Sequence, residues 1–183
     1  MRFEPLSLDG AFLIHPVRHG DPRGFFSEVF RHDLFSAAIP GITFVQDNHS
    51  LSGPRGTLRG LHFQKAPRAQ GKLVRVTRGA VLDVIVDIRH GSKTFGQHLG
   101  VELSAENWTQ LWVPAGFLHG FCTLTENVEF LYKVTAPYSA EHDAGIAFDD
   151  PDLQIQWPFP REALTISAKD AALPRLKDLP PLF

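Results

Sequence analysis

Two histidines give the clearest sign of chemistry in this sequence. His62 in "RGLHFQ" and His119 in "PAGFLHGF" each stand on an apolar, glycine-flanked segment that we expect to be a strand. An imidazole, with an unperturbed pKa of about 6.5, can accept a proton at neutral pH, so His62 is a candidate general base. The ordinary alternative is a structural histidine held by hydrogen bonds.

A lysine and a tyrosine point to the same kind of chemistry. Alternation along "KLVRV" places Lys72 on the face of the valines, and alternation along "VEFLYKV" places Tyr132 among apolar residues. An ammonium group or a phenol is costly to bury in a plain core, so both predict a cavity that holds water or ligand. Alternatively, Lys72 reaches the rim and Tyr132 is an ordinary core residue.

A metal centre is the second chemistry that the histidines raise. A strand-borne site would need another imidazole two residues after His62 and a carboxylate a few residues further on. Those positions hold Gln64 and Arg68. Glutamine is a poor ligand and arginine repels cations, so we expect no metal and no other cofactor. The motifs "GxSxG", "GxxxxGK" and "GxGxxG" are also missing from the sequence, which disfavours covalent and nucleotide-hydrolysing chemistry.

The composition predicts one all-β domain over residues 1–183. The 14 prolines and 15 glycines are scattered, and 43% of the residues are apolar, which is enough for one core. Many short apolar segments between these breaks favour an antiparallel sandwich or barrel. The expected strands are residues 11–17, 25–30, 42–51, 73–78, 81–88, 98–103, 110–113, 117–124 and 128–135. Short helices are expected at 32–38 and 168–173, and an irregular tail after them.

Alternation is clearest in "AVLDVIVDI". The even-numbered aliphatic residues from Leu82 to Ile88 share one face, and Asp83 and Asp87 lie on the other. We therefore expect the even-numbered face to be the interior.

Charge and composition exclude several classes of protein. There are 18 basic against 20 acidic residues, a formal net charge of -2, which argues against a protein that coats nucleic acid. The start lacks a secretory pattern and no run of 18 apolar residues occurs, so we expect a cytoplasmic protein without a membrane segment. The single cysteine, Cys122, excludes an internal disulfide and fits a small buried residue.

Eight motifs in a fixed order closely resemble the dTDP-4-dehydrorhamnose 3,5-epimerase family, and together they cover nearly the whole chain. They are "DPRGFFSEVF" (21–30), "QDNHS" (46–50), "GTLRGLHFQ" (56–64), "AQGKLVRVTRGAVLDVIVDIR" (69–89), "LWVPAGFLHGF" (111–121), "LYKVT" (131–135), "DDPDLQIQWP" (149–158) and "LTISAKD" (164–170). The resemblance implies a cupin-type double-stranded β-helix, or jelly roll, that has lost its metal and works as a homodimer. The implied reaction inverts C3 and C5 of dTDP-4-dehydro-6-deoxy-D-glucose, next to its C4 ketone.

The same resemblance implies roles for individual residues. His62 is the base, Asp170 its carboxylate partner and Tyr132 the proton donor, while Lys72 lies near the keto oxygen. The implied substrate contacts are Arg23, Glu28, Gln46, Asp47, Asn48, Arg59, His119, Asp143 and Lys169. The first two of these would reach across the dimer into the partner's site.

Two features of the sequence stand against a simple transfer of these roles. Strict alternation places Arg59 and His62 on opposite faces of one strand, unless a bulge near Gly60 changes the register. The family commonly has glutamate at Asp143, and also tryptophan at Phe148 and alanine at Leu118. The shorter carboxylate is compatible with a different sugar, or with inversion at one carbon. A non-catalytic sugar-nucleotide binding protein and a metal-dependent oxygenase are the remaining alternatives.

Overall fold

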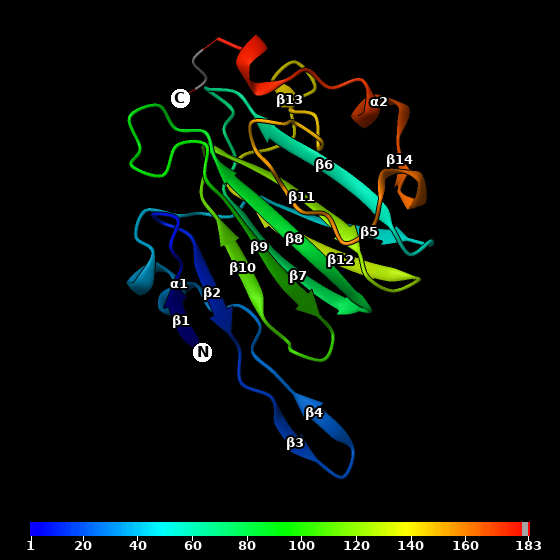
Figure 1. Cartoon of the computed structure of the whole chain (residues 1–183). Coiled ribbons are helices and arrows are strands. Elements are labelled where there is room, and N and C mark those ends of the chain that lie inside the picture. Colours follow the sequence, from blue (N-terminus) through cyan, green and yellow to red (C-terminus); the bar gives the residue numbers. More distant parts are fainter. Residues whose placement is uncertain (181–182) are drawn as a thin grey trace.

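Two β-sheets face each other and form most of the structure (Figure 1). The computed structural model describes residues 1–180 and 183. The first sheet contains, in spatial order, β1 (Arg2–Pro5), β2 (Phe12–His15), β10 (Gln110–Val113), β7 (Lys72–Arg78), β12 (Val128–Val134) and β5 (Gln46–Ser52). The second contains β13 (Asp143–Gly145), β6 (Thr57–Gln64), β11 (Phe117–Thr123), β8 (Ala80–Asp87) and β9 (His98–Ser104), with β14 (Thr165–Ile166) parallel to β6.

The predicted all-β class is confirmed. Apart from β14, the strand pairs of both sheets are antiparallel, and most sheet neighbours are not consecutive in sequence, as in a jelly roll. The helices are short: α1 (His32–Ala38), α2 (Ala168–Ala171) and the 3-10 turns η1 (Arg161–Ala163) and η2 (Leu176–Asp178). No helix among the described residues is long and apolar enough to cross a membrane.

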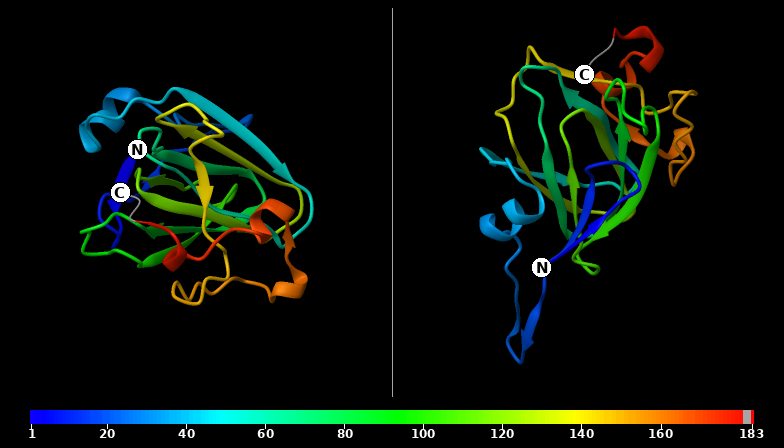
Figure 2. Two further views of the ribbon diagram at one scale, coloured as in Figure 1. Left: turned by 90° about the horizontal axis from the view of Figure 1, so that it is seen from above. Right: turned by 90° about the vertical axis from the view of Figure 1, so that its left-hand side faces the viewer.

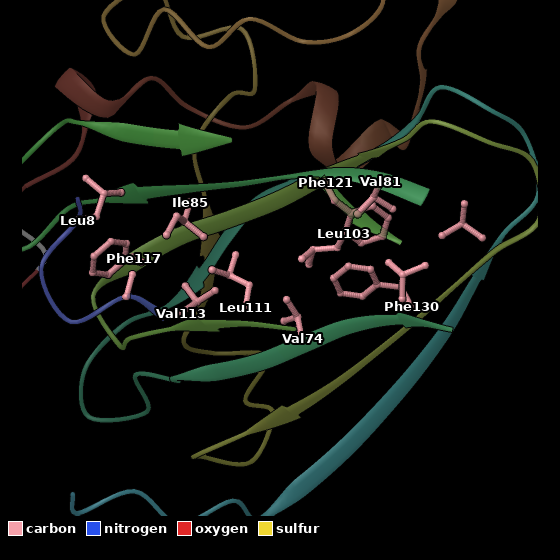
Figure 3. Packing of buried hydrophobic residues seen from close by; sticks show 13 residues of the cluster. Leu8, Val74, Val81, Ile85, Leu103, Leu111, Val113, Phe117, Phe121 and Phe130 are labelled. Carbon is pink, nitrogen blue, oxygen red and sulfur yellow. The ribbon is translucent and has the colours of Figure 1, made fainter. Parts of the chain in front are cut away.

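The main core lies between the sheets (Figure 3). Strands from both sheets contribute alternate residues to it, because successive side chains of a strand point to opposite faces. Its buried members on the strands are Val74, Val76, Val81, Ile85, Leu103, Leu111, Val113, Phe117, Phe121, Val128 and Phe130.

The sequence-based assignment of the two faces of β8 is wrong. Its odd-numbered residues, including Val81 and Ile85, belong to the core between the sheets. The even-numbered Val84 and Val86 pack instead in a second cluster, beneath the C-terminal part of the chain. Both faces of β8 are buried, so aliphatic content alone could not identify the interior face. Asp83 belongs to the odd-numbered face and therefore lies between the sheets.

The outer face of the first sheet is partly covered by α1, which has the predicted bounds. The hairpin of β3 (His19–Asp21) and β4 (Gly24–Phe26) projects away from both sheets (Figure 2). A strand was expected at residues 25–30, but the observed strand β4 ends at Phe26. Beyond it the chain contacts the sheet through Phe30, whose ring packs on Phe35 and Phe44, rather than through a strand ladder.

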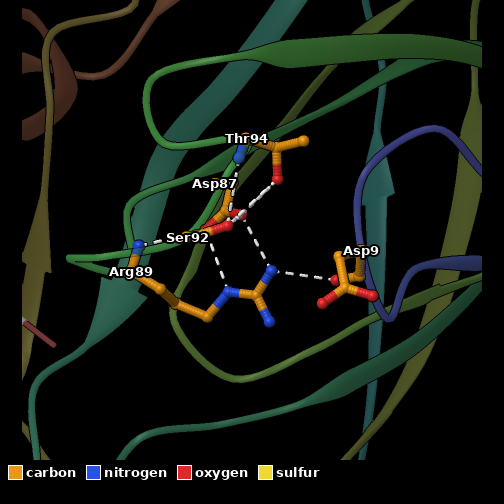
Figure 4. A network of polar contacts seen from close by, with 5 residues as sticks. All are labelled: Asp9, Asp87, Arg89, Ser92 and Thr94. Atoms are coloured by element: carbon orange, nitrogen blue, oxygen red, sulfur yellow. Dashed lines mark hydrogen bonds and ion pairs between the residues drawn. The ribbon is translucent and has the colours of Figure 1, made fainter.

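A buried carboxylate fastens the loop after β8 (Figure 4). Asp87 is fully buried and accepts hydrogen bonds from Arg89, from Ser92 Oγ at 2.5 Å and from Thr94 Oγ1 at 2.6 Å. Arg89 also donates to the backbone oxygen of Asp9 at 2.9 Å, which ties this loop to the N-terminal turn. Burial alone would raise the pKa of Asp87, but these donors hold it far below its ordinary value.

Candidate active site

A cavity of about 560 Å³ opens between the two sheets and falls within the size range of small-molecule sites. Part of its wall is apolar, formed by Leu58, Phe121, Phe130 and Ile166. The polar lining includes the four predicted catalytic residues and three of the predicted substrate contacts, namely His62, Lys72, Tyr132, Asp170, Arg59, His119 and Lys169. The structure therefore brings most of the predicted site together from distant parts of the chain.

His62 and Asp170 form a hydrogen-bonded pair. His62 Nε2 lies 2.7 Å from Asp170 Oδ1, so an N–H on Nε2 donates to the carboxylate and leaves Nδ1 free to accept a proton. The other carboxylate oxygen accepts the Gly60 amide at 3.1 Å. Burial alone would raise the pKa of Asp170, but the hydrogen bonds from His62 and Gly60 lower it overall, so the carboxylate stays ionised.

The position of Asp170 depends on helix α2. Ser167 caps this helix by accepting the backbone amide of Asp170 at 3.0 Å. The preceding strand β14 is bonded to β6, the strand of His62, so both partners are held by one sheet. The helix at 168–173 was predicted, although it ends at Ala171; the contact across more than a hundred residues could not be predicted from spacing.

A bulge at Gly60 resolves the conflict between Arg59 and His62. His62 lies opposite His119 on β11, whereas Arg59 lies opposite Phe121, so two residues of β6 oppose Gly120. Directly opposed residues point to the same side of a sheet, so Arg59 and His62 both face the cavity. Gly60 has φ +119°, and a Cβ there would lie 2.7 Å from the Cα of Gly120.

Lys72 is a buried cation that lines the cavity. Its side chain lines the cavity, only 9% of the residue is exposed, and within the described residues it has no hydrogen bond or ion pair. Burial lowers the pKa of Lys72 to about 8, although the charges of Asp83 and Asp143 act in the opposite direction. Lys72 is therefore cationic at neutral pH and is available to an oxygen of a ligand.

Tyr132 faces the cavity from the opposite sheet. It pairs with Val74 of β7 and with Asn48 of β5, which turns its ring inward as predicted. Burial raises the pKa of Tyr132, and the charge of Asp143 adds to this, while Arg59 opposes it. The phenol therefore keeps its proton at neutral pH and can donate it.

Asp83 is a site residue that the sequence interpretation missed. It is fully buried, and both of its carboxylate oxygens lie 3.0 Å from Nε2 of His119. The alternation in "AVLDVIVDI" had already separated Asp83 from the aliphatic face. The pattern is misleading because both faces of β8 are buried, and the aliphatic face lies outside the core between the sheets.

The predicted contacts on β5 divide between two faces. Gln46 and Asn48 are joined by a 2.8 Å hydrogen bond and share a face with Ser50, which lines the cavity. Asp47 lies on the other face, where Lys133 donates to it at 2.8 Å. The structure therefore does not bring Asp47 to the cavity of its own chain.

Asp143 stands at the start of β13, close to the cavity, and is not free. Lys169 donates to its Oδ2 at 2.5 Å, and the hydroxyl of Tyr138 donates to the same oxygen at 3.3 Å. The other two departures from the family pattern, Phe148 and Leu118, are buried side chains away from the cavity lining.

Arg23 and Glu28 are not part of this cavity. The side chain of Arg23 lies at the turn of the β3–β4 hairpin, is 89% exposed and pairs with its neighbour Asp21. Glu28 lies 3.9 Å from Arg31 on the segment that follows the hairpin. Neither side chain can contact a ligand in the cavity of its own chain.

The position of Gln64 does not fit a metal ligand. Its amide donates to the backbone oxygens of Arg68 and Pro137, and its oxygen accepts the amide of Ser139 at 2.7 Å. Over residues 1–180 and 183, no group of three or more histidine, cysteine, aspartate and glutamate side chains is placed to hold an ion. Cys122 is buried, and burial raises its pKa to about 11, so it is a poor nucleophile.

A carboxylate-paired imidazole, an ammonium group without a partner among the described residues and a protonated phenol line one cavity, and these are groups that an acid–base enzyme uses. Comparison with known proteins gives the family. The sequence model of the dTDP-4-dehydrorhamnose 3,5-epimerase family, a family of isomerases, matches residues 5–178. The chain belongs to this family.

Individual relatives are similar in sequence to this chain over nearly its whole length. A protein named dTDP-4-dehydrorhamnose 3,5-epimerase from Sinorhizobium fredii is 54% identical over 183 residues, which is 100% of this chain and 93% of the relative. A dTDP-4-dehydrorhamnose 3-epimerase from Streptomyces niveus is 36% identical over 174 residues, covering 94% of this chain and 84% of the relative.

A solved structure confirms the cupin-type jelly roll. The 3,5-epimerase from Legionella pneumophila, in complex with dTDP-4-keto-L-rhamnose, superposes with a TM-score of 0.92 at 45% identity. The similarity covers 96% of this chain and 93% of that chain.

Proposed function

We propose that this protein is a dTDP-4-dehydrorhamnose 3,5-epimerase, which inverts C3 and C5 of dTDP-4-dehydro-6-deoxy-D-glucose to give dTDP-4-dehydro-L-rhamnose. One observation supports this most strongly. A base, His62 paired with Asp170, and an acid, Tyr132, line one cavity from opposite sheets. Inversion needs this arrangement, since the proton must leave one face of the sugar and return to the other.

The reaction follows from the charges around the cavity. His62 Nδ1 removes the proton from the carbon next to the ketone, and the electron pair of the C–H bond moves onto the C4 oxygen. Lys72 stabilises this enolate, an effect commonly worth about 3 to 4 kcal/mol per well-placed donor. Tyr132 then protonates the carbon on the opposite face, and the C4 ketone forms again. His62 and Tyr132 regain their starting protonation states through water, because about a third of the His62 side chain is exposed (31%).

Double inversion is favoured over inversion at one carbon. The relative named 3,5-epimerase is 54% identical, whereas the relative named 3-epimerase is 36% identical. Single inversion at C3 or C5 of a related dTDP-4-keto-6-deoxy sugar is the second candidate, since it needs the same base and acid. The shorter carboxylate of Asp143 is the feature that favours it.

Incubation of the dTDP-keto sugar in D2O tests the proposal. We expect deuterium and inverted configuration at both C3 and C5, read by NMR, and no exchange with the His62→Ala variant. Deuterium at one carbon would establish a single epimerase. Tight binding without exchange would establish a non-catalytic binding protein, and activity lost on chelation would establish metal dependence.

The working form that we propose is a homodimer, with residues 1–183 of each copy as one domain. In such a dimer Arg23 and Glu28 complete the partner's site, and Arg23 joins Arg59 on the diphosphate through forked hydrogen bonds. The exposure of Arg23 and of Phe26 (68%) on the projecting hairpin supports this arrangement. The cytoplasmic location remains a prediction, to be tested by cell fractionation.

Mixing two defective variants tests the shared site. A dimer of one His62→Ala chain and one Arg23→Ala chain contains one intact site, so random pairing restores about a quarter of the sites. If the activity of the mixture stays at the level of the separate variants, Arg23 does not contribute to the partner's site.

A further inference from the structure

A second histidine–carboxylate pair lies beside the first one. His119 and His62 are directly opposed on the neighbouring strands β11 and β6, and each ring bonds a carboxylate through Nε2. The first carboxylate, Asp170, is supplied by helix α2, whereas Asp83 comes from β8, on the other side of β11 (Figure 1). The proposed epimerisation steps use His62, Lys72 and Tyr132 and give Asp83 no role.

We propose that Asp83 is a positioning residue, which holds His119 with its proton on Nε2 and its Nδ1 toward the substrate, and which supplies negative charge to neighbouring Lys72. The inference rests on the proposed function, because the substrate that His119 and Lys72 would contact is the keto sugar.

The hydrogen bonds determine the state of the His119 ring. Both oxygens of Asp83 lie 3.0 Å from Nε2, and a carboxylate only accepts, so the proton is on Nε2. Burial lowers the pKa of His119, while Asp83 opposes this, so the ring is neutral with a lone pair on Nδ1. Within the described residues, Nδ1 of His119 has no hydrogen-bond partner. Every buried side-chain nitrogen or oxygen atom there does have a partner, so Nδ1 cannot be a buried atom. Nδ1 is therefore open to the cavity, where it can accept a hydrogen bond from a sugar hydroxyl.

The second effect of Asp83 is the negative charge that it supplies to Lys72. Besides Lys72, the charged residues that line the cavity are Arg59 on β6 and Lys169 and Asp170 on α2, while His119 and Tyr132 face it as neutral groups. The two carboxylates that attract the ammonium group are Asp83 and Asp143, with Asp83 the stronger. Asp143 is already paired with Lys169. The partner of Asp83 is a neutral imidazole, so its charge remains available to Lys72.

The strand β8 offers a matched control. Asp87 is as fully buried as Asp83, lies four residues further along the same face, and bonds Arg89 rather than a cavity residue. Asp83→Asn and Asp87→Asn each remove one buried charge from the same strand with little change in volume. Only the first substitution removes a charge that is bonded to a residue of the cavity lining.

The pH dependence of epimerisation in these variants tests the proposal. For Asp83→Asn we expect kcat/KM to fall about 10- to 100-fold at neutral pH, the usual effect of a hydrogen bond to a charged group. We also expect the alkaline limb of the kcat/KM profile to move to lower pH, because Lys72 loses its proton more easily without the negative charge of Asp83. Asp87→Asn should lower thermal stability and leave this limb in place. An unshifted limb in folded Asp83→Asn would overturn the proposal.

Ring nitrogen NMR of His119 tests it without any substrate. In the wild type we expect one tautomer, protonated on Nε2, and in Asp83→Ala a mixture of both tautomers. If the ring of the Ala variant kept the wild-type tautomer, Asp83 would not position it. This result does not depend on turnover, so failure of the inference is distinct from failure of the proposed function, which would appear as a wild type without deuterium exchange.

Discussion

Replacing Asp170 by Asn should nearly stop catalysis while leaving the shape of the site intact. The carboxylate now accepts from two donors, His62 at 2.7 Å and the Gly60 amide at 3.1 Å. An amide has one acceptor oxygen. If that oxygen stays on the Gly60 amide, the NH2 group faces Nε2 of His62, which must then accept. The ring proton moves to Nδ1, and the base is lost from the cavity.

The size of this effect has two parts. Loss of a hydrogen bond to a charged partner costs about 1.5 to 3 kcal/mol when the imidazolium forms, and the wrong tautomer adds to this. The corresponding change in a serine-protease triad lowers kcat about 10⁴-fold. We expect kcat of Asp170→Asn to fall about 10³-fold or more, with little change in KM.

The assay is the initial rate of deuterium incorporation at C3 and C5, measured by NMR with saturating keto sugar. Asp150→Asn is the control, because Asp150 is buried and accepts the Leu176 amide at 2.7 Å outside the cavity. This control should lose stability but retain its kcat. A rate for Asp170→Asn within threefold of the wild type would refute the role given to the His62–Asp170 pair.

Three further substitutions and the pH profile test other parts of the site and of the fold. Because Lys72 has a pKa of about 8, kcat/KM should fall as pH rises above about 8, and a pH–rate profile that stays flat to pH 10 would contradict its role. Lys72→Met removes a buried, unpaired charge and should stabilise the fold by about 1 to 3 kcal/mol, seen as a higher Tm, while activity is lost. Gly60→Ala places a Cβ 2.7 Å from Gly120 and should lower both Tm and kcat; an unchanged Tm would argue against the bulge. The folded pKa of Asp87 lies below its unfolded value, so its stabilising effect is present at neutral pH and lost in acid. Asp87→Asn should therefore cost about 3 kcal/mol in urea unfolding at pH 7 and about 1 kcal/mol less near pH 3, because pH 3 lies just below the unfolded pKa but still above the folded one.

The alternation of apolar and polar residues predicted which face of a strand points inward wherever the two faces differ in polarity. Alternation identified the inward faces of β7 and β12 correctly, because Lys72 shares its face with two valines and Tyr132 shares its face with apolar residues only. It failed for β8, where both faces are buried under different clusters. A strand covered on both sides has no solvent face to reveal which side is the interior.

The site could be predicted only in part from the residues themselves. The conflict between Arg59 and His62 indicated a bulge near Gly60, and the register shows it. Pairing of His62 with Asp170, and of His119 with Asp83, depends on how distant segments meet, and no spacing in the sequence encodes that. The same holds for Asp47, because only the packing of β5 in the folded protein determines which of its two faces lines the cavity.

The most direct test of the central claim, that base and acid act from opposite faces of the sugar, is the product formed by Tyr132→Phe in D2O. His62 is intact in this variant, so we predict that deuterium still enters at the carbons beside the ketone. Without the phenol, the proton returns from the side of His62, and the exchanged carbons keep their original configuration. Deuterated product inverted in the wild-type proportion would contradict the claim, since another group would then be the acid.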